Sequence, residues 1–272
     1  MNDSKTSIRL GTAFLAPVSL GRCGTPEAPW ELPVSAGPPA DADEGTGTCG
    51  QGARPREVLI EEALITSEIE GEKLDVQAVR SSVARRLGLP TAGLPFSSNR
   101  QADGVVEILL DATQGHDEEP TTARLFGWHA ALFPTGYSGL HKINVASWRD
   151  DREGPMRVIS GPVGRETIHY QAPPAERIDA EMDKFLRWWK TSRGQWEGLL
   201  RAAVAHLWFV AIHPFDDGNG RIARTLTDMA LAQDEDLPTR YYSLSSRIMV
   251  ERESYYATLE RTQKGDGDIT GW

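Results

Sequence analysis

The sequence predicts an all-α protein with a single β-hairpin. From Arg56 onward, stretches rich in good helix formers carry apolar residues at helical spacing. Only residues 148–172 differ, because two short runs, MRVIS and ETIHY, flank the turn-forming GPVG. The 272 residues are enough for one large domain or two small ones.

The chain is expected to divide into three parts. Residues 1–55 are rich in Gly, Pro, Ala and Thr and show no helical or strand period, which predicts a disordered or irregular tail. A helical region follows over 56–90, with Gly71 and Gly88 as the expected helix stops. Residues 91–272 are expected to form the core domain.

Within the core domain we expect helices joined by short loops, with Thr121 or Thr122 capping the second helix. Residues 134–147 are expected to be a loop, and Pro173–Pro174 to end the hairpin. The expected helices are GVVEILLDAT, TTARLFGWHAALF, AERIDAEMDKFLRWWKTS, QWEGLLRAAVAHLWFVAI, GNGRIARTLTDMALAQ and SSRIMVERESYYATLERTQ.

Composition excludes several classes of function. The net charge of −10 argues against binding to a nucleic-acid backbone, which depends on Lys and Arg. No apolar run approaches the roughly 20 residues that a membrane span needs. Cys23 and Cys49 form no CxxC pair, which suits a reducing cytosol. We therefore predict a cytoplasmic protein that binds neither nucleic acid nor membrane.

One stretch, HPFDDGNGRIAR from His213 to Arg224, gathers groups that suggest chemistry. Pro214 stops the long apolar helix before it, so His213 is expected at a helix end that faces a loop. Gly218 and Gly220 permit positive φ and close backbone approach. They lead into a new helix, whose unpaired N–H groups form an anion site.

The charged residues of this stretch favour a polyphosphate as that anion. Arg221 and Arg224 are three residues apart and project near one helix face. Asp217 would repel phosphate unless a divalent cation such as Mg²⁺ lay between them. His213 is then placed to accept a proton from an incoming hydroxyl. Each piece alone is common, and only their joint spacing suggests transfer from a nucleoside triphosphate to an alcohol.

The stretch resembles the signature of Fic-domain proteins, His-x-Phe-x-Asp/Glu-Gly-Asn-Gly-Arg-x-x-Arg, at every fixed position. The similarity extends over roughly Val58 to Trp272 and includes WR at 148–149 and APP at 172–174. The resemblance implies an all-α Fic core with a β-hairpin flap. It also implies transfer of AMP from ATP to a Ser, Thr or Tyr hydroxyl of a target protein or of the chain itself, with release of pyrophosphate.

The resemblance assigns roles residue by residue. His213 would be the base that deprotonates the target hydroxyl, Asp217 would hold Mg²⁺, and Phe215 would pack inward. Asp216 falls on a variable position and receives no role. The phosphates of ATP would contact the backbone amides or side chains of Gly218, Asn219, Gly220, Arg221 and Arg224.

A second pattern lies near the start of the helical region, in EVLIEEALITSEIEGE. Leu59, Ala63, Thr66 and Glu70 are spaced 4, 3 and 4 apart and fall on one stripe of a helix. Glu70 therefore continues a face that Leu59 and Ala63 would bury. A buried carboxylate needs a cation, and Arg224 is a good candidate.

The same stretch resembles the motif of Fic proteins that are inhibited in cis, Ser/Thr-x-x-x-Glu-Gly or -Asn, here Thr66 to Gly71. This resemblance implies that Glu70 pairs with Arg224 and blocks the position that the γ-phosphate must take. The alternative is that Glu70 makes only a structural salt bridge.

Two further groups of residues are candidates for contacts with substrates. In the family the hairpin pins an extended target segment by strand addition, and Ile168, His169 and Tyr170 lie on the expected strand. A hairpin that merely covers the core explains them nearly as well. Tyr241 and Tyr242 follow the motif helix and are candidates for contacting adenine, although core packing explains them equally well.

The sequence thus predicts an autoinhibited protein adenylyltransferase that uses ATP and Mg²⁺. Removal of AMP, or transfer of another nucleotide or of phosphocholine, stays open as an alternative, as does a locked nucleotide-binding module with negligible turnover. The target protein is not predicted, and a homodimer, common in the family, stays open. His206 is expected to be a core or supporting histidine, because no further zinc ligands occur at suitable spacing.

Overall fold

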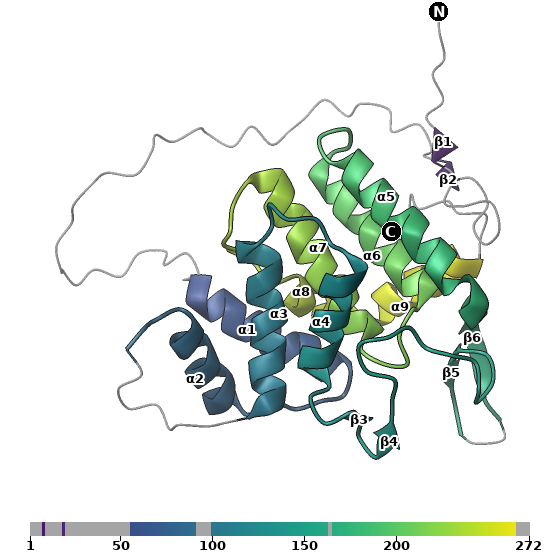
Figure 1. Cartoon of the computed structure of the whole chain (residues 1–272), viewed down its shortest axis with the longest axis horizontal. Coiled ribbons are helices and arrows are strands. Elements are labelled where there is room, and N and C mark those ends of the chain that lie inside the picture. Colours follow the sequence, from purple (N-terminus) through teal and green to yellow (C-terminus); the bar gives the residue numbers. More distant parts are fainter. Residues whose placement is uncertain (1–6, 9–17, 20–54, 91–98, 163–164, 265–272) are drawn as a thin grey trace, which may run out of the picture.

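The computed structural model describes residues 7–8, 18–19, 55–90, 99–162 and 165–264. In this part the protein is mostly helical with three two-stranded antiparallel pairs (Figure 1), which confirms the predicted all-α class. The predicted tail, 1–55, lies outside the described residues except for its last residue and the pair β1 (Ser7–Ile8) and β2 (Val18–Ser19).

The helices lie where the helical patterns placed them, except that the single helix expected over 245–263 is two helices separated at Glu251. Thr121 caps the fourth, since its side chain accepts a hydrogen bond from the Arg124 N–H at 3.1 Å. Gly71 and Gly88 follow the first two at φ +82° and +65°, as expected of helix stops. The helices are α1 (Pro55–Ile69), α2 (Val76–Arg86), α3 (Arg100–Gln114), α4 (Thr122–Leu132), α5 (Ile178–Ser192), α6 (Gly198–Ile212), α7 (Asn219–Glu235), α8 (Leu244–Val250) and α9 (Arg252–Lys264).

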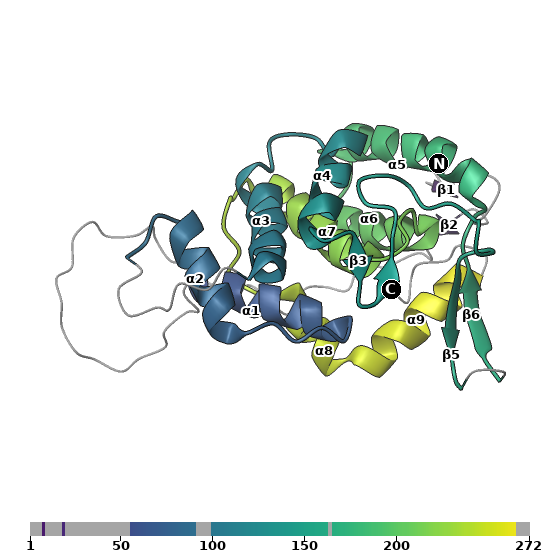
Figure 2. The ribbon, with the colours of Figure 1, turned by 60° about the horizontal axis from the view of Figure 1, so that its bottom comes forward.

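Helices α6 and α7 form the centre of the molecule and are buried over most of their length. The α6 sequence is apolar almost all round, as a helix enclosed by others requires. Figures 1 and 2 show α3 and α4 on one side of this pair and α5 on the other. Close packing of α3 on α4 depends on Gly104, because a Cβ there would meet the Ala131 carbonyl oxygen at 1.8 Å.

Helix α1 packs against α2, α3, α7 and α8, so the N-terminal helical region lies directly on the core. The predicted boundary between residues 90 and 91 adjoins a segment, 91–98, outside the described residues. No helix in the described part of the chain is long and apolar enough to cross a membrane.

The predicted hairpin is present as β5 (Arg157–Ser160) and β6 (Thr167–Gln171). It projects beside the end of α9 (Figure 2), and Tyr170 fastens it to α6 by donating to the Ala211 carbonyl at 2.8 Å. The prediction of a single hairpin was wrong, because the expected loop 134–147 contains a second pair, β3 (Tyr137–Ser138) and β4 (His141–Lys142). Two-residue strands are too short to show a period.

Candidate active site

His213 ends α6 in the left-handed conformation, with φ 51° and ψ 58°. Its backbone N–H donates to the Phe209 carbonyl at 3.0 Å. Nδ1 lies 3.2 Å from the Val210 carbonyl, which can only accept, so Nδ1 carries the proton and Nε2 keeps a lone pair. Burial lowers the pKa of His213, against the opposing effect of that hydrogen bond. The result is a neutral imidazole that can act as a base.

Arg149 holds the loop after His213 in place. Its Nε donates to the His213 carbonyl at 2.8 Å, and its backbone N–H donates to the Pro214 carbonyl at 2.9 Å. Nη1 pairs with Asp151 at 2.8 Å, while Nη2 donates to the Pro173 carbonyl. Burial lowers the pKa of Arg149, and Asp151 opposes that change. This guanidinium therefore braces the strained helix end, a role that the sequence analysis missed.

The turn itself is closed by Asn219 at the start of α7. Its Oδ1 accepts from the Phe215 N–H at 3.0 Å, and its Nδ2 donates to the Phe215 carbonyl at 2.8 Å. Phe215 is fully buried, as expected. Gly218 has φ +80°, a conformation that favours glycine. A Cβ there would also lie 2.8 Å from the Phe133 ring, which is too close. The amides of the first turn of α7 have no acceptor within the helix.

His129 supports the same loop from α4 and was also missed. Its ring stacks on Phe215 with centroids 4.2 Å apart and an interplanar angle of 7°. Nδ1 accepts from the Ala146 N–H at 3.2 Å, so Nε2 carries the proton and donates to the Asp217 carbonyl at 3.2 Å. Burial lowers the pKa of His129 to about 4, which keeps the ring neutral near pH 7.

Asp217 and Asp216 point to different partners. One Asp217 carboxylate oxygen accepts from the Gly218 N–H at 2.6 Å, and the other accepts from the Ser138 hydroxyl of β3. Asp216, which received no role from the sequence, accepts from the Asn144 N–H at 2.8 Å and fastens the loop to the segment after β4. Of these two carboxylates, that of Asp217 is therefore the one at the mouth of the α7 N-terminus, where a cation could share it.

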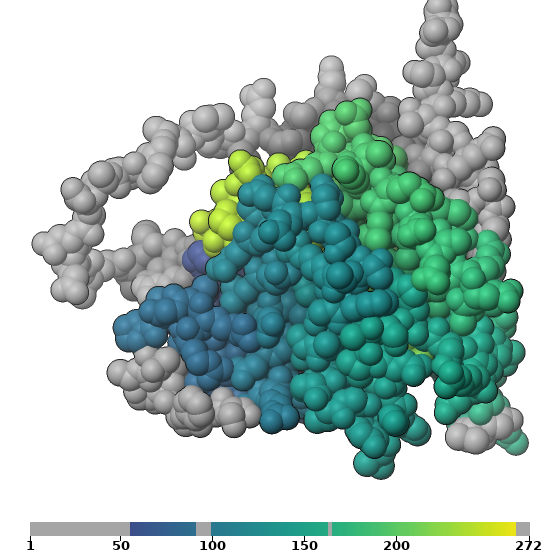
Figure 3. Space-filling model, viewed as in Figure 1, coloured from purple at the N-terminus to yellow at the C-terminus, as the bar shows by residue number. Residues whose placement is uncertain are grey.

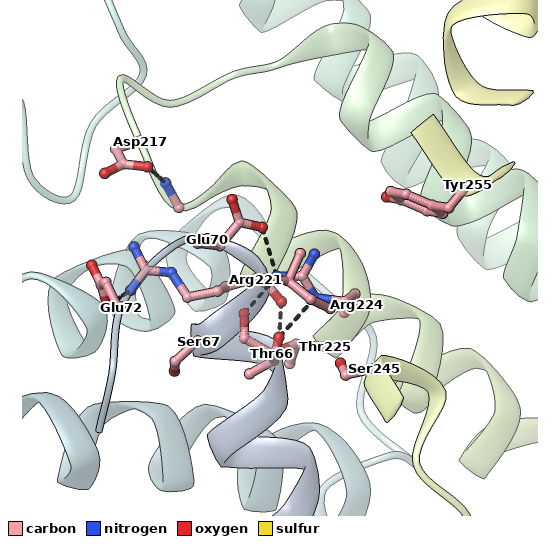
Figure 4. A network of polar contacts seen from close by, with 12 residues as sticks. Thr66, Ser67, Glu70, Glu72, Asp217, Arg221, Arg224, Thr225, Ser245 and Tyr255 are labelled. Atoms are coloured by element: carbon pink, nitrogen blue, oxygen red, sulfur yellow. Dashed lines mark hydrogen bonds and ion pairs between the residues drawn. The ribbon is translucent and has the colours of Figure 1, made fainter. Parts of the chain in front are cut away.

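The predicted pairing of Glu70 with Arg224 is confirmed (Figure 4). Arg224 is buried, and its Nη2 donates to Glu70 Oε1 at 2.6 Å. Thr66 accepts from the same guanidinium through its hydroxyl, at 2.7 Å from Nε, and through its carbonyl, at 2.9 Å from Nη2. Burial is the largest single effect and would lower the pKa of Arg224, but the charge and hydrogen bond of Glu70, together with Tyr255 and Glu62, raise that pKa above its usual value. Glu70 is thus the counter-ion of a buried cation.

Arg221 has a similar partner that the sequence analysis did not identify. Its Nη1 donates to Glu72 Oε2 at 2.6 Å, and its guanidinium carbon lies 4.9 Å from the centre of the Phe133 ring. Both arginines of the motif are therefore paired with carboxylates from the segment that follows α1 (Figure 4). Glu70 also sits against Gly220, where an added Cβ would lie 2.1 Å from Glu70 Oε1.

The three residues expected to dock a target on the hairpin differ in exposure. Ile168 is 48% exposed on β6. His169 Nδ1 lies 2.8 Å from Glu260 Oε2, so it connects the hairpin to α9. Tyr170 is buried with its hydroxyl already bound, and it anchors the hairpin. Of these three residues, Ile168 is exposed, His169 is partly buried and Tyr170 is buried.

The structure does not bring the pair Tyr241 and Tyr242 to the anion site. Tyr242 donates to Glu235 at 2.9 Å, at the C-terminal end of α7. That end is roughly 24 Å along the helix from its first residue. Figure 4 also draws Tyr255 of α9, and burial raises the pKa of Tyr255.

His206 is a core histidine, as predicted. Its Nδ1 lies 3.0 Å from the Thr227 hydroxyl, and its Nε2 lies 2.8 Å from the Tyr255 hydroxyl. Both ring nitrogens are therefore occupied by protein groups.

Comparison with known proteins agrees with this geometry. Residues 119–231 match the model of the Fic/DOC family, and residues 46–89 match a domain of unknown function, DUF4172. A segment of 74 residues is 42% identical to the uridine 5'-monophosphate transferase of Xanthomonas campestris, covering 24% of this chain and 13% of that protein. A segment of 67 residues is 40% identical to the protein adenylyltransferase fic-1 of Caenorhabditis elegans, covering 24% of this chain and 12% of that protein.

Solved structures share the fold. A Fic family protein from Desulfovibrio desulfuricans superposes with a TM-score of 0.58 at 22% identity, covering 80% of this chain and 60% of the other. Fic-1 from Caenorhabditis elegans gives a TM-score of 0.54 at 21% identity, covering 79% of this chain and 58% of the other. Residues 119–231, which include the signature at the end of α6, therefore match the Fic/DOC family in sequence, and the solved structures share the fold of the chain.

Proposed function

We propose that the protein transfers AMP from ATP to a hydroxyl side chain of a protein, either itself or another chain. The observation that carries the proposal is the placing of a neutral His213 beside an α7 N-terminus that bears two buried arginines. Curated relatives named as an adenylyltransferase and a uridine 5'-monophosphate transferase support nucleotidyl transfer over a short segment.

In this proposal the imidazole of His213 removes the proton from the target hydroxyl. The hydroxyl oxygen then forms a bond to the α-phosphorus of ATP, and the bond from that phosphorus to the bridging oxygen breaks to release pyrophosphate. Backbone N–H groups at the start of α7, together with Arg221, stabilise the negative charge on the phosphates. The contacts of Arg149 and His129 keep the loop in position throughout.

The donors present suit Mg²⁺. Asp217 offers one carboxylate, and Mg²⁺ in nucleotide sites takes one or two carboxylates together with phosphate oxygens and water. Each oxygen of Asp217 accepts one hydrogen bond from the protein and retains a further lone pair. Bound there, the ion would offset the charge of the triphosphate.

Glu70 is proposed to restrain the reaction. Its carboxylate occupies Arg224 and lies against Gly220, at the helix end where the anion would bind. A γ-phosphate there would meet a negative charge and would lose a cation partner. ATP would therefore bind weakly or in an unreactive pose until Glu70 moves away.

The test is self-labelling with labelled ATP and Mg²⁺. We expect Glu70→Gly to raise incorporation at least tenfold over wild type, since tenfold corresponds to about 1.4 kcal/mol of repulsion removed. Glu68→Gly makes the same change at an exposed glutamate of α1 and should leave incorporation near the wild-type level. Equal incorporation in Glu70→Gly and wild type would contradict the inhibitory role. His213→Ala in the Glu70→Gly background should abolish labelling, and undiminished labelling would remove His213 as the base.

A second candidate is a locked nucleotide-binding module, which the ion pairs on both arginines favour. Calorimetry of Glu70→Gly with ATP separates the two. Binding without any labelled product, with ATP or with UTP, would support the module. Labelled product supports the transferase.

A further inference from the structure

A side-chain cluster at the C-terminal end of α7 lies apart from the site described above. His116 and Asp117 follow α3, and Asp236 follows α7. In Figure 1 these helix ends lie at the top, beside the α5–α6 connection, and Figure 3 shows the three segments meeting on the surface. One ligand atom of each residue lies within 4.8 Å of the others. We propose that this cluster binds a divalent transition-metal ion of the zinc class.

The imidazole of His116 is prepared for a metal. Its side chain is only 6% exposed. Nδ1 lies 2.7 Å from the Thr113 carbonyl, which can only accept, so Nδ1 carries the proton and Nε2 has the lone pair. Nε2 is buried and has no hydrogen-bond partner. Metal-binding histidines usually donate their other N–H to a carbonyl or carboxylate in this way.

The carboxylates stand close to a coordinating arrangement. His116 Nε2 lies 3.6 Å from Asp236 Oδ1 and 3.8 Å from Asp117 Oδ1. Neighbouring ligand atoms around a tetrahedral zinc, with bonds of about 2.0–2.1 Å, are roughly 3.3 Å apart. Both carboxylates are largely exposed, 88% for Asp236 and 79% for Asp117, so their side chains can rotate by that small amount.

The surroundings favour a cation and hold the cluster together without one. The last carbonyls of α7 place partial negative charge at this end of the helix. Gln233 of α7 donates to the His116 carbonyl at 2.7 Å and so fixes the two chain segments against each other. Among the described residues, two arginines lie nearby: the Nη2 of Arg193 is 3.7 Å from Asp117 Oδ1, and Arg124 donates to the carbonyls of Gly115 and Glu118.

The ligand set also selects the metal. An imidazole nitrogen with two carboxylates suits zinc and its neighbours, whereas Mg²⁺ and Ca²⁺ prefer oxygen alone. One or more waters would complete the coordination. The cluster is separated from Asp217 by the length of α7, roughly 24 Å, so it is not part of the proposed nucleotide site.

The experiment is calorimetric titration of the whole chain with ZnCl₂, and in parallel with MgCl₂. Cys23→Ser and Cys49→Ser are included so that thiols do not compete as ligands. We expect one zinc per chain, no competition from Mg²⁺, and at least tenfold weaker zinc binding in Asp236→Asn. Asp183→Asn, an exposed aspartate of α5, is the matched control and should bind as the parent does.

His116→Gln should also lose zinc binding. The visible spectrum of the Co²⁺-loaded protein should differ from that of the parent in both Asp236→Asn and His116→Gln. Asparagine tolerates the left-handed backbone of residue 236, where φ is 51°, so Asp236→Asn stays informative if His116→Gln does not fold. No zinc binding up to about 1 mM, or binding unchanged in Asp236→Asn, would overturn the proposal. Neither outcome bears on nucleotide transfer.

Discussion

The two sides of the candidate active site are built differently. On one side, the buried side chains of Arg149 and His129 hold the loop after α6 through hydrogen bonds to backbone carbonyls. On the other, Glu70 and Glu72 hold the arginines of α7, and their side chains are 29% and 30% exposed. The loop is therefore held by two side chains that are themselves buried. The arginines are themselves buried, but the carboxylates that hold them are partly reached by water, so a carboxylate that moves away leaves a buried cation that favours another anion in its place.

The side of the site that holds the arginines also contains a buried residue, Thr66. Thr66 accepts two hydrogen bonds from Arg224 and is buried, so the guanidinium keeps its orientation when Glu70 moves. Release of one carboxylate would therefore free a cation that already points toward the helix end. The fixed side provides geometry and the exposed side provides regulation, under the proposed function.

Removal of Arg149 should have the largest effect on stability. Arg149→Ala leaves the His213 and Pro173 carbonyls and the Asp151 carboxylate without their donor, and breaking such a buried set costs about 3–5 kcal/mol. Urea unfolding measures the loss. Arg152→Ala, at a side chain that is 86% exposed, should change the free energy of unfolding by about 0.5 kcal/mol or less. A loss below about 1 kcal/mol for Arg149→Ala would show that the loop does not depend on this clamp.

The sequence predicted the parts of the site that are local. His213, the glycine turn and the α7 N-terminus follow from residues within twelve positions of one another. The Glu70–Arg224 pair spans 154 positions, and helical spacing predicted it by placing Glu70 on a buried stripe. The pair is present, but the predicted burial was wrong, because Glu70 lies just past the end of α1 with its side chain 29% exposed. Resemblance to the Fic signature added the assignment of roles.

The parts that could not be predicted depend on distant backbone groups. Arg149 bonds a carbonyl 64 positions away, and His129 bonds one 88 positions away. Any residue offers a carbonyl, so no pattern marks these acceptors. Tyr242 looked like a candidate for the adenine only because it follows the motif helix, and it packs at the far end of α7 instead.

Acid should destabilise the buried hydrogen-bond network around His206. Thr227 donates its hydroxyl proton to the Ala223 carbonyl and so accepts from His206 Nδ1, which leaves Nε2 to accept from Tyr255. Burial lowers the pKa of His206 to about 3, whereas the unfolded chain has about 6.5. The unfolded state thus binds more protons below pH 6.5, and the stabilisation present above that pH is lost as pH falls toward 3.

By pH 4.5 this one group should remove about 2–3 kcal/mol from the free energy of unfolding. We expect His206→Gln to lose correspondingly less stability between pH 7.5 and 4.5 than wild type, measured by urea unfolding at both values. His129 titrates in the same direction in both proteins, so the difference between them isolates His206. Identical pH dependence in the two proteins would mean that His206 is not held neutral by this network.

The smallest expected effect concerns Glu72, which tests whether the exposed side carries two restraints or one. Glu72→Gln keeps an acceptor for Arg221 but removes the charge, so stability should change by less than about 1 kcal/mol. In the Glu70→Gly background, Arg221 would then bind phosphate with less competition. The apparent KM for ATP in self-labelling should fall about two- to fivefold, while kcat changes little. Glu68→Gln in the same background should leave KM unchanged, because that residue is exposed on α1. If Glu72→Gln also leaves KM unchanged, Glu72 only fastens α1 to the core, and Glu70 alone controls the site.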